Sequence, residues 1–208
     1  MKRLIWLLLI ACGSGGTVSS VTAAAGSDFP PDDVANEVIA ALSGGDPMAI
    51  AGLTNLGPMP WVALVEGATV EEAAGIDEEN ALAVAANFWT GFLDSAGLAG
   101  EDVSNVEAFT EGATDFARLD LASGSIVLKE NEGWHIDVIA SFGAPLAERL
   151  LSAVEVVVAN RSPEADVLRT MLRNERDAVA VAVADPAITT SAREAVAEVL
   201  AAIDAIDG

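Results

Sequence analysis

Apolar residues first recur with helical spacing just after residue 31. The stretch PDDVANEVIAALSGGD at 31–46 places apolar residues three and four positions apart, as on one face of an amphipathic helix, at Val34, Val38, Ile39 and Leu42. Asp32 and Asp33 stand at its amino end, where the helix dipole favours negative charge, and the glycine pair at 44–45 ends it. We therefore interpret the two aspartates as part of a helix start rather than as a metal site.

Residues 46–75 give a weaker pattern. Asp46-Pro47 predicts a short helix through Leu53, whereas GPMPW at 57–61 predicts a turn, because proline removes a backbone donor and restricts the residue before it. The following WVALVEGATVEEAAG fits either a strand or a short helix. Trp61 is expected in an apolar loop that either fills the core or lines a pocket.

A longer, largely buried helix is predicted after Gly75. The acidic triplet at 77–79 supplies negative charge for its start, and ALAVAANFWTGFLDSAG carries Phe88, Trp89 and Phe92. The triplet lacks the alternating oxygen ligands and the central glycine of a calcium-binding loop. We therefore interpret it as a helix start.

The period changes at about residue 102, where short segments rich in β-formers begin. Their separators EGA, ASG and NEG are turn sequences, and the arrangement predicts a meander of three or four antiparallel strands. The predicted strands are 103–109, 114–121, 125–130 and 134–141.

From Pro145 onward the pattern is helical again. One helix is expected from Pro145 to Asn160, and Ser162 caps a second that begins with Pro163 and runs to about residue 185. Ser191 and Glu194 form a capping box for a third.

These elements predict an α+β fold in which N-terminal helices pack on a curved antiparallel meander, followed by a C-terminal helical segment of about three helices. The first helix ending in ALSGGDP, the aromatic-rich helix and the phrase LKENEGWHIDV resemble, over residues 32–143, the cone-shaped fold named after nuclear transport factor 2. That resemblance implies a pocket between helices and sheet, for which Trp61, Phe88, Trp89, Phe92 and Trp134 are the candidate lining residues. Members of that fold include isomerases, dehydratases and plain binding or assembly domains, so the fold does not fix the function.

The first twelve residues carry a separate signal. Lys2 and Arg3 precede an apolar stretch, Leu4 to Ala11, that is far shorter than the roughly 20 residues of a membrane-spanning helix, so a secretory signal is predicted. Its end, Leu9-Ile10-Ala11-Cys12, resembles the lipobox of bacterial lipoproteins. The resemblance implies acylation of the Cys12 thiol, cleavage before it and anchorage in a bacterial cell membrane or outer envelope, on the extracytoplasmic side. The alternative is an ordinary signal peptide with a cysteine there by chance.

Residues 13–31, GSGGTVSSVTAAAGSDFPP, are small and polar and end in a proline pair, which predicts a flexible spacer. The chain is therefore divided into a signal peptide (1–11), a lipidated cysteine with spacer (12–31), an α+β cone-like domain (32–143) and a C-terminal helical segment (144–208).

Charge excludes several classes of partner. The chain has 32 acidic and 10 basic residues and a formal net charge of −22, which becomes −24 once cleavage removes Lys2 and Arg3. Such a surface repels nucleic acid and anionic lipid headgroups. Lys129 is then the one lysine left, so a polybasic membrane patch is excluded as well. The hydrophobic fraction of 52% nevertheless provides ample material for a core.

Residues with catalytic chemistry are scarce. His135 is the only histidine, and on a strand it would share a face with Asp137, as a general acid/base couple or as an ordinary surface pair. The chain has no tyrosine to polarise a carbonyl. One histidine and an acylated cysteine also argue against zinc, which takes three or four nitrogen or sulfur ligands. No metal and no cofactor is predicted.

Arg169, Arg173 and Arg176 are spaced i, i+4 and i+7 and predict a basic stripe along one helix. The stripe either pairs with nearby acids such as Glu148 or Asp166, or docks an acidic partner.

Three functions remain open. The first is a non-enzymatic, lipid-anchored extracytoplasmic protein that binds a small apolar ligand or an envelope protein. The second is an isomerase or dehydratase that uses His135 and Asp137. The third is an envelope assembly module that acts through its C-terminal helices.

Overall fold

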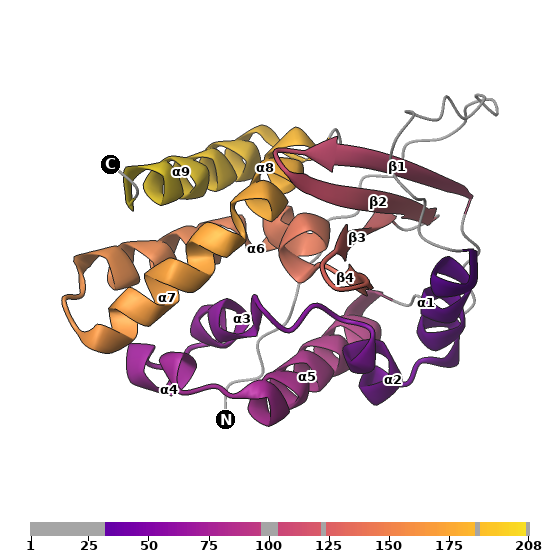
Figure 1. Ribbon diagram of the computed structural model, residues 1–208, viewed down its shortest axis with the longest axis horizontal. Coiled ribbons are helices and arrows are strands. Elements are labelled where there is room, and N and C mark those ends of the chain that lie inside the picture. Colours follow the sequence, from indigo (N-terminus) through magenta and orange to yellow (C-terminus); the bar gives the residue numbers. More distant parts are fainter. Residues whose placement is uncertain (1–31, 97–103, 122–123, 186–187, 207–208) are drawn as a thin grey trace.

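A four-stranded antiparallel sheet lies between two groups of helices (Figure 1). The computed structural model describes residues 32–96, 104–121, 124–185 and 188–206. The predicted signal peptide, lipobox and spacer, Cys12 included, lie outside the described residues. The predicted α+β class with an antiparallel meander is confirmed.

In the part of the chain that the structure describes, the helices before the sheet are α1 (Asp32–Gly44), α2 (Pro47–Gly52), α3 (Met59–Val65), α4 (Val70–Ala74) and α5 (Glu78–Ala96). The strands are β1 (Asn105–Glu111), β2 (Thr114–Leu121), β3 (Gly124–Glu130) and β4 (Trp134–Ile136). The helices after the sheet are α6 (Val138–Ala159), α7 (Pro163–Asn174), α8 (Arg176–Ala184) and α9 (Thr190–Ile206).

The predicted turn at 57–61 is wrong beyond Pro58, because α3 begins at Met59. Pro60 lies in the first turn of α3, where its missing N–H would have no helical partner in any case. The next segment, WVALVEGATVEEAAG, whose sequence fits either a strand or a short helix, forms the rest of α3 and all of α4. Thr69 and Glu72 form a capping box at the start of α4. Trp61 is therefore a helix residue, not a loop residue, and it is 1% exposed.

The sheet order is β1-β2-β3-β4, with every neighbouring pair antiparallel. The chain reverses between β1 and β2 at Gly112, whose φ is +61°. A Cβ added to Gly112 would lie 2.5 Å from Asp177 Oδ1. Glycine therefore suits this position for two reasons, the positive φ and the close approach of α8.

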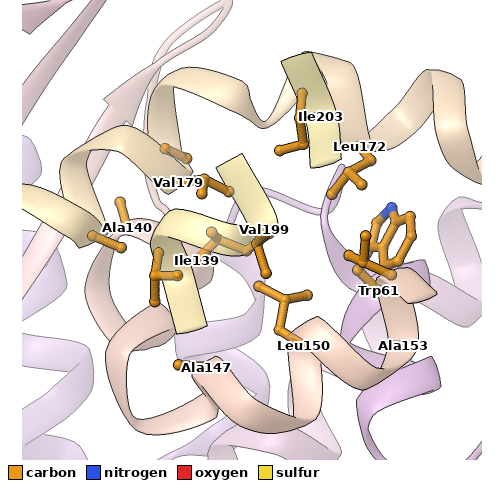
Figure 2. Close-up of a cluster of buried hydrophobic side chains, with 14 of the residues drawn as sticks. Trp61, Ile139, Ala140, Ala147, Leu150, Ala153, Leu172, Val179, Val199 and Ile203 are labelled. Carbon is orange, nitrogen blue, oxygen red and sulfur yellow. The ribbon is translucent and has the colours of Figure 1, made fainter. Parts of the chain in front are cut away.

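Alternating side chains of the strands enter two hydrophobic clusters on opposite faces of the sheet. Ala117, Leu119, Ile126, Leu128 and Ile136 belong to the α5 cluster, which also holds buried residues of α1, α2 and α5. Phe116 and Val127 belong to the α6 cluster, shown in Figure 2, which joins α3 and α4 to the helices after the sheet. Because β2 and β3 are buried on both faces, the sheet is the middle layer of the molecule.

The predicted fourth strand is wrong from residue 137. The strand ends at Ile136, and Asp137 caps α6 by accepting a hydrogen bond from the backbone N–H of Ala140, 2.8 Å away. Helix α6 thus begins seven residues before the predicted start at Pro145, which lies inside it. The boundary predicted between residues 143 and 144 falls within this continuous helix.

The second C-terminal helix is also different from the prediction, because it is two helices. The backbone leaves helical geometry at Glu175, with φ −98° and ψ 8°, so α7 and α8 point in different directions. Ser162 caps α7 with Pro163 in the first turn, as predicted. The last helix is capped by Thr189, whose Oγ1 accepts from Ala192 N–H, and not by the predicted Ser191.

Among the described residues, the helices are too short or too polar to span a bilayer.

Gly143 of α6 tests how closely α6 and α8 pack. A Cβ on Gly143 would lie 2.9 Å from Ala182 Cβ, whereas a Cβ on the exposed Gly91 of α5 would have no neighbour within 4 Å. We expect Gly91→Ala to raise the free energy of unfolding by about 0.5–1 kcal/mol, because alanine is the better helix former. Gly143→Ala should give a value at least about 1 kcal/mol below that of Gly91→Ala, because the added methyl overpacks the interface. Urea unfolding followed by tryptophan fluorescence measures both, and equal gains would contradict the close packing.

Candidate functional site

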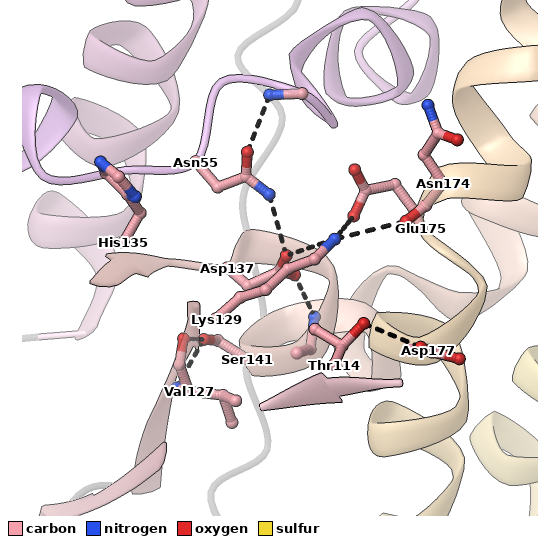
Figure 3. Close-up of polar contacts among 12 residues, drawn as sticks. Asn55, Thr114, Val127, Lys129, His135, Asp137, Ser141, Asn174, Glu175 and Asp177 are labelled. Carbon is pink, nitrogen blue, oxygen red and sulfur yellow. Dashed lines mark hydrogen bonds and ion pairs between the residues drawn. The ribbon is translucent and has the colours of Figure 1, made fainter. Parts of the chain in front are cut away.

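A buried cluster of charged and polar side chains surrounds Lys129 (Figure 3). The ammonium Nζ of Lys129 lies 2.9 Å from Glu175 Oε2 and 3.8 Å from Asp137 Oδ2. It also donates to the backbone carbonyl of Asn174 at 3.4 Å. The exposed fractions of Lys129, Asp137 and Glu175 are 7%, 0% and 4%, so the cluster is enclosed by protein.

Asn55 connects this cluster to the segment that follows α2. Its Nδ2 donates to Asp137 Oδ2 at 3.2 Å, and its Oδ1 accepts from the Gly57 N–H at 3.1 Å. The same segment is hydrogen-bonded to β4 through Asn55 N–H to the Ile136 carbonyl. The carboxylate of Asp137 therefore receives hydrogen bonds from Asn55 and Ala140 in addition to the charge of Lys129.

The pKa of Glu175 is raised to about 7. Burial is the largest cause, and the nearby Asp137 carboxylate adds to it, while Lys129 acts in the opposite direction. For Lys129, burial disfavours the charged ammonium, but the two carboxylates outweigh burial and hold its pKa above the ordinary value. Near neutral pH the cluster thus contains a charged lysine and a Glu175 that gains and loses a proton.

The side chains of the cluster are poorly placed to react with a molecule from outside the protein. A charged ammonium has no lone pair for nucleophilic attack, and the raised pKa of Lys129 keeps it charged. Its donors are directed at Glu175, Asp137 and Asn174, which belong to the protein itself. The arrangement therefore serves to join β3, α6 and the α7–α8 junction.

His135 and Asp137 form neither the acid/base couple nor the surface pair that the sequence left open. Asp137 is buried and caps α6, with Lys129 and Asn55 as its other partners. The half-buried imidazole of His135 has its Nδ1 3.0 Å from the Gly133 carbonyl oxygen. In Figure 3 the His135 ring lies apart from the Asp137 carboxylate. The geometric reason is that residue 137 has left the strand, so the two-residue alternation no longer applies to it.

The five aromatic residues predicted to line a pocket are divided between the two clusters. Phe88, Trp89 and Phe92 of α5 pack against Phe142 of α6, with ring centroids 4.5–5.8 Å from that of Phe142. Trp134 packs against the same α5 cluster, whereas Trp61 lies in the α6 cluster. Trp61 therefore fills core, and its indole N–H has no hydrogen-bond partner among the described residues.

The arginine stripe is divided as well. Arg169 and Arg173 remain on α7, but Arg176 follows the break at Glu175 and its Nε donates to Asp204 of α9 at 2.8 Å. Arg169 pairs with Asp166, one of the acids considered from the sequence, and it also donates to the carbonyls of Val157 and Asn160. The predicted partner Glu148 is exposed on α6.

An open depression of about 400 Å³ lies between α7 and α9, beside the end of α6. Its polar lining consists of Arg161, Arg169, Arg173 and Asp166, and its apolar lining of Val158, Ala202, Ala205 and Ile206. Two arginines of the predicted stripe thus line the depression together with Arg161, which lies outside that stripe. The signal that could have found Arg161 is its place two residues before the helix that carries the others.

The Lys129 cluster was also missed from the sequence. Lys129 was considered only as a residual positive charge, although a lone lysine at the end of the apolar run SIVL already suggests a buried partner. The partner could not be identified, because Glu175 is 46 residues away and stands inside a helical pattern.

Removal of the ammonium tests the role of the cluster. We expect Lys129→Met to lower the free energy of unfolding by about 3–5 kcal/mol, because Asp137 and Glu175 would remain buried without their cation. The double variant Lys129→Met/Glu175→Gln should recover part of the loss, since one of the two carboxylates is then neutral. Chemical unfolding measures this, and a loss below about 1 kcal/mol for Lys129→Met would contradict a stabilising cluster.

Glu175 predicts a specific pH dependence. Its folded-state pKa of about 7 lies above the ordinary 4.5. Its contribution to the free energy of unfolding is therefore fully present below pH 4.5 and is lost as the pH rises through about 7. The wild-type free energy of unfolding should therefore decrease across this window relative to Glu175→Gln, with a slope of at most about 1.4 kcal/mol per pH unit. The exposed Glu148→Gln serves as the matched control, and parallel pH curves for wild type and Glu175→Gln would contradict the shift.

The described candidate residues therefore lie in four places: the Lys129 cluster with Asp137, the edge of β4 with His135, the aromatic cores, and the depression with Arg169 and Arg173. Comparison of the chain with protein families, with curated proteins and with solved structures gives no match.

Proposed function

We propose that this chain is a lipid-anchored extracytoplasmic interaction protein without catalytic activity. The anchor is Cys12, on the strength of the Leu9-Ile10-Ala11-Cys12 motif, and the spacer to residue 31 separates it from the folded part. Two acyl chains on such a cysteine give stable membrane attachment, whereas one is marginal. The observation that carries the binding role is the open depression between α7 and α9.

The residues with catalytic chemistry have structural contacts instead, which supports a non-enzymatic role. Asp137 caps α6 and pairs with Lys129, and Lys129 is enclosed between two carboxylates. The aromatic side chains of α5 are packed against Phe142. The small apolar ligand considered from the sequence therefore has less support than a protein partner.

A more specific form of this proposal is an envelope assembly module in which the C-terminal helices make the contact. It is supported by the position of the depression, whose lining comes from the end of α6 onward. Deletion of residues 144–208 does not test it, because the cut would fall inside α6 and would remove most of the α6 cluster. Single substitutions on the surface of α7 and α9 are the suitable variants.

We also infer a relationship between residues 32–143 and the cone fold named after nuclear transport factor 2. The support is the order of elements, in which helices precede an antiparallel meander and α1, α2 and α5 pack on one of its faces. The strand that begins in the motif LKENEGWHIDV is shorter than this resemblance implies, because β4 ends at Ile136 and α6 follows directly.

The anchor is tested by Cys12→Ser in a bacterial host. We expect the wild-type chain in the membrane fraction and Cys12→Ser in the soluble extracytoplasmic fraction, because the acylated thiol is the attachment point. Mass spectrometry of the wild-type N-terminal peptide should show cleavage before Cys12 and a diacylglycerol adduct. Ser14→Ala is the control and should remain in the membrane fraction. If Cys12→Ser also stays with membranes, the anchor is wrong.

A further inference from the structure

We propose that the depression between α7 and α9 docks a short acidic segment of a partner protein, one that presents carboxylates next to aliphatic side chains. The proposal rests on the interaction role proposed above and adds the surface and the chemistry of the partner.

The charge of the depression is opposite to that of the chain. Three of the ten basic residues, Arg161, Arg169 and Arg173, line it together with one acid, Asp166, which gives the lining a net charge of +2. The whole chain has a formal charge of −22. A carboxylate is therefore attracted locally. A long acidic chain would extend past the depression and come within the Debye length, about 8 Å, of the surrounding acidic residues, which would repel it. This selects a short segment.

Two of the arginines are already held in place by carbonyls at helix ends. Arg169 Nη1 donates to the carbonyls of Val157 and Asn160 at 2.7 and 2.9 Å, and Arg173 Nη2 donates to the Ile206 carbonyl at 3.0 Å. With the bond to Asp166, Arg169 uses three of the five N–H donors of a guanidinium. Such side chains lose little conformational entropy when a ligand binds, which favours affinity.

Arg161 is the residue with the most freedom to engage a ligand. Its side chain is exposed, and the structure gives it no ion pair or hydrogen bond with a described residue. Guanidinium binds carboxylate in a two-pronged geometry, which matches aspartate and glutamate side chains. We therefore expect Arg161 to make the main charged contact.

The apolar part of the lining defines the rest of the partner. Val158 is 44% exposed, and Ala202, Ala205 and Ile206 form the opposite side. Aliphatic side chains of a peptide can cover this surface while its carboxylates meet the arginines. An anionic lipid surface fits less well. A membrane plane would also contact the acidic surroundings of the depression and be repelled by them, whereas a short peptide would contact the depression alone.

The experiment uses the full-length chain in detergent and a dye-labelled, N-acetylated hexapeptide of sequence Glu-Leu-Glu-Ile-Glu-Leu, with fluorescence anisotropy as the readout. Lysine and glutamine replace glutamate in two control peptides. Arg161→Glu removes the main contact, and Ala205→Trp blocks the depression without changing its charge. Arg193→Glu is the control: it makes the same charge change at an exposed position, where the guanidinium donates to the Asp185 carbonyl. Near-ultraviolet circular dichroism verifies that each variant is folded.

We expect the glutamate peptide to bind the wild-type chain and both control peptides to bind at least about tenfold more weakly, a difference of about 1.4 kcal/mol. Arg161→Glu and Ala205→Trp should each weaken the glutamate peptide by about tenfold or more, and Arg193→Glu by less than about twofold. No binding of the glutamate peptide at millimolar concentration would overturn the proposal, as would equal losses in Arg161→Glu and Arg193→Glu.

A second arm distinguishes a lipid surface and separates this proposal from the anchor. Cys12→Ser protein is mixed with vesicles containing phosphatidylglycerol, and Arg161-dependent association with these vesicles would overturn a peptide partner. Cys12→Ser should bind the glutamate peptide as tightly as the wild-type chain, because the depression is formed by α6 to α9. Failure of the anchor therefore leaves peptide binding unchanged, and failure of peptide binding leaves membrane fractionation unchanged.

Discussion

The ammonium of Lys129 is the interaction on which the arrangement of this protein depends. It lies between Glu175 and Asp137 and thereby joins β3, the start of α6 and the junction of α7 with α8. Asn55 adds the segment after α2 to the same cluster. One cation shared by two buried carboxylates is a costly arrangement, because each charge has lost its hydration, and it persists where the geometry provides further hydrogen bonds. Here those come from Asn55, Ala140 and Asn174.

This buried cluster also determines the surface chemistry of the C-terminal helices. Glu175 turns its carboxylate inward to Lys129, and the backbone leaves helical geometry at that residue. Arg176 is consequently directed to Asp204 of α9, whereas Arg169 and Arg173 stay on α7 and line the depression with Arg161. A continuous helix would have kept Arg169, Arg173 and Arg176 on a single face. The break thus converts an expected stripe into a compact basic site beside apolar residues.

The proposed role follows from how the scarce reactive residues are used. The only lysine beyond the predicted signal peptide and the buried Asp137 hold the fold together, and the aromatic residues of α5 fill the space next to α6. Among the described residues, Arg161, Arg169 and Arg173 line the depression, whereas the chain as a whole has a formal net charge of −22. An interaction protein held near a membrane by its N-terminal cysteine is consistent with this division, in which the interior supplies stability and the C-terminal helices supply the contact.

The sequence by itself determined the elements whose signals are local. Helical spacing predicted α1 and α5, turn residues separated the strands of the meander, and Ser162-Pro163 predicted the start of α7, because caps, turns and periodicity act within a few residues. Tertiary structure decided the rest. Asp137 begins a helix where the pattern continued a strand, and Glu175 interrupts a helix where the pattern continued one, because both carboxylates are bound by Lys129 from another element. The basic depression likewise depends on the packing of α7 against α9, a contact between residues more than thirty positions apart that no local pattern records.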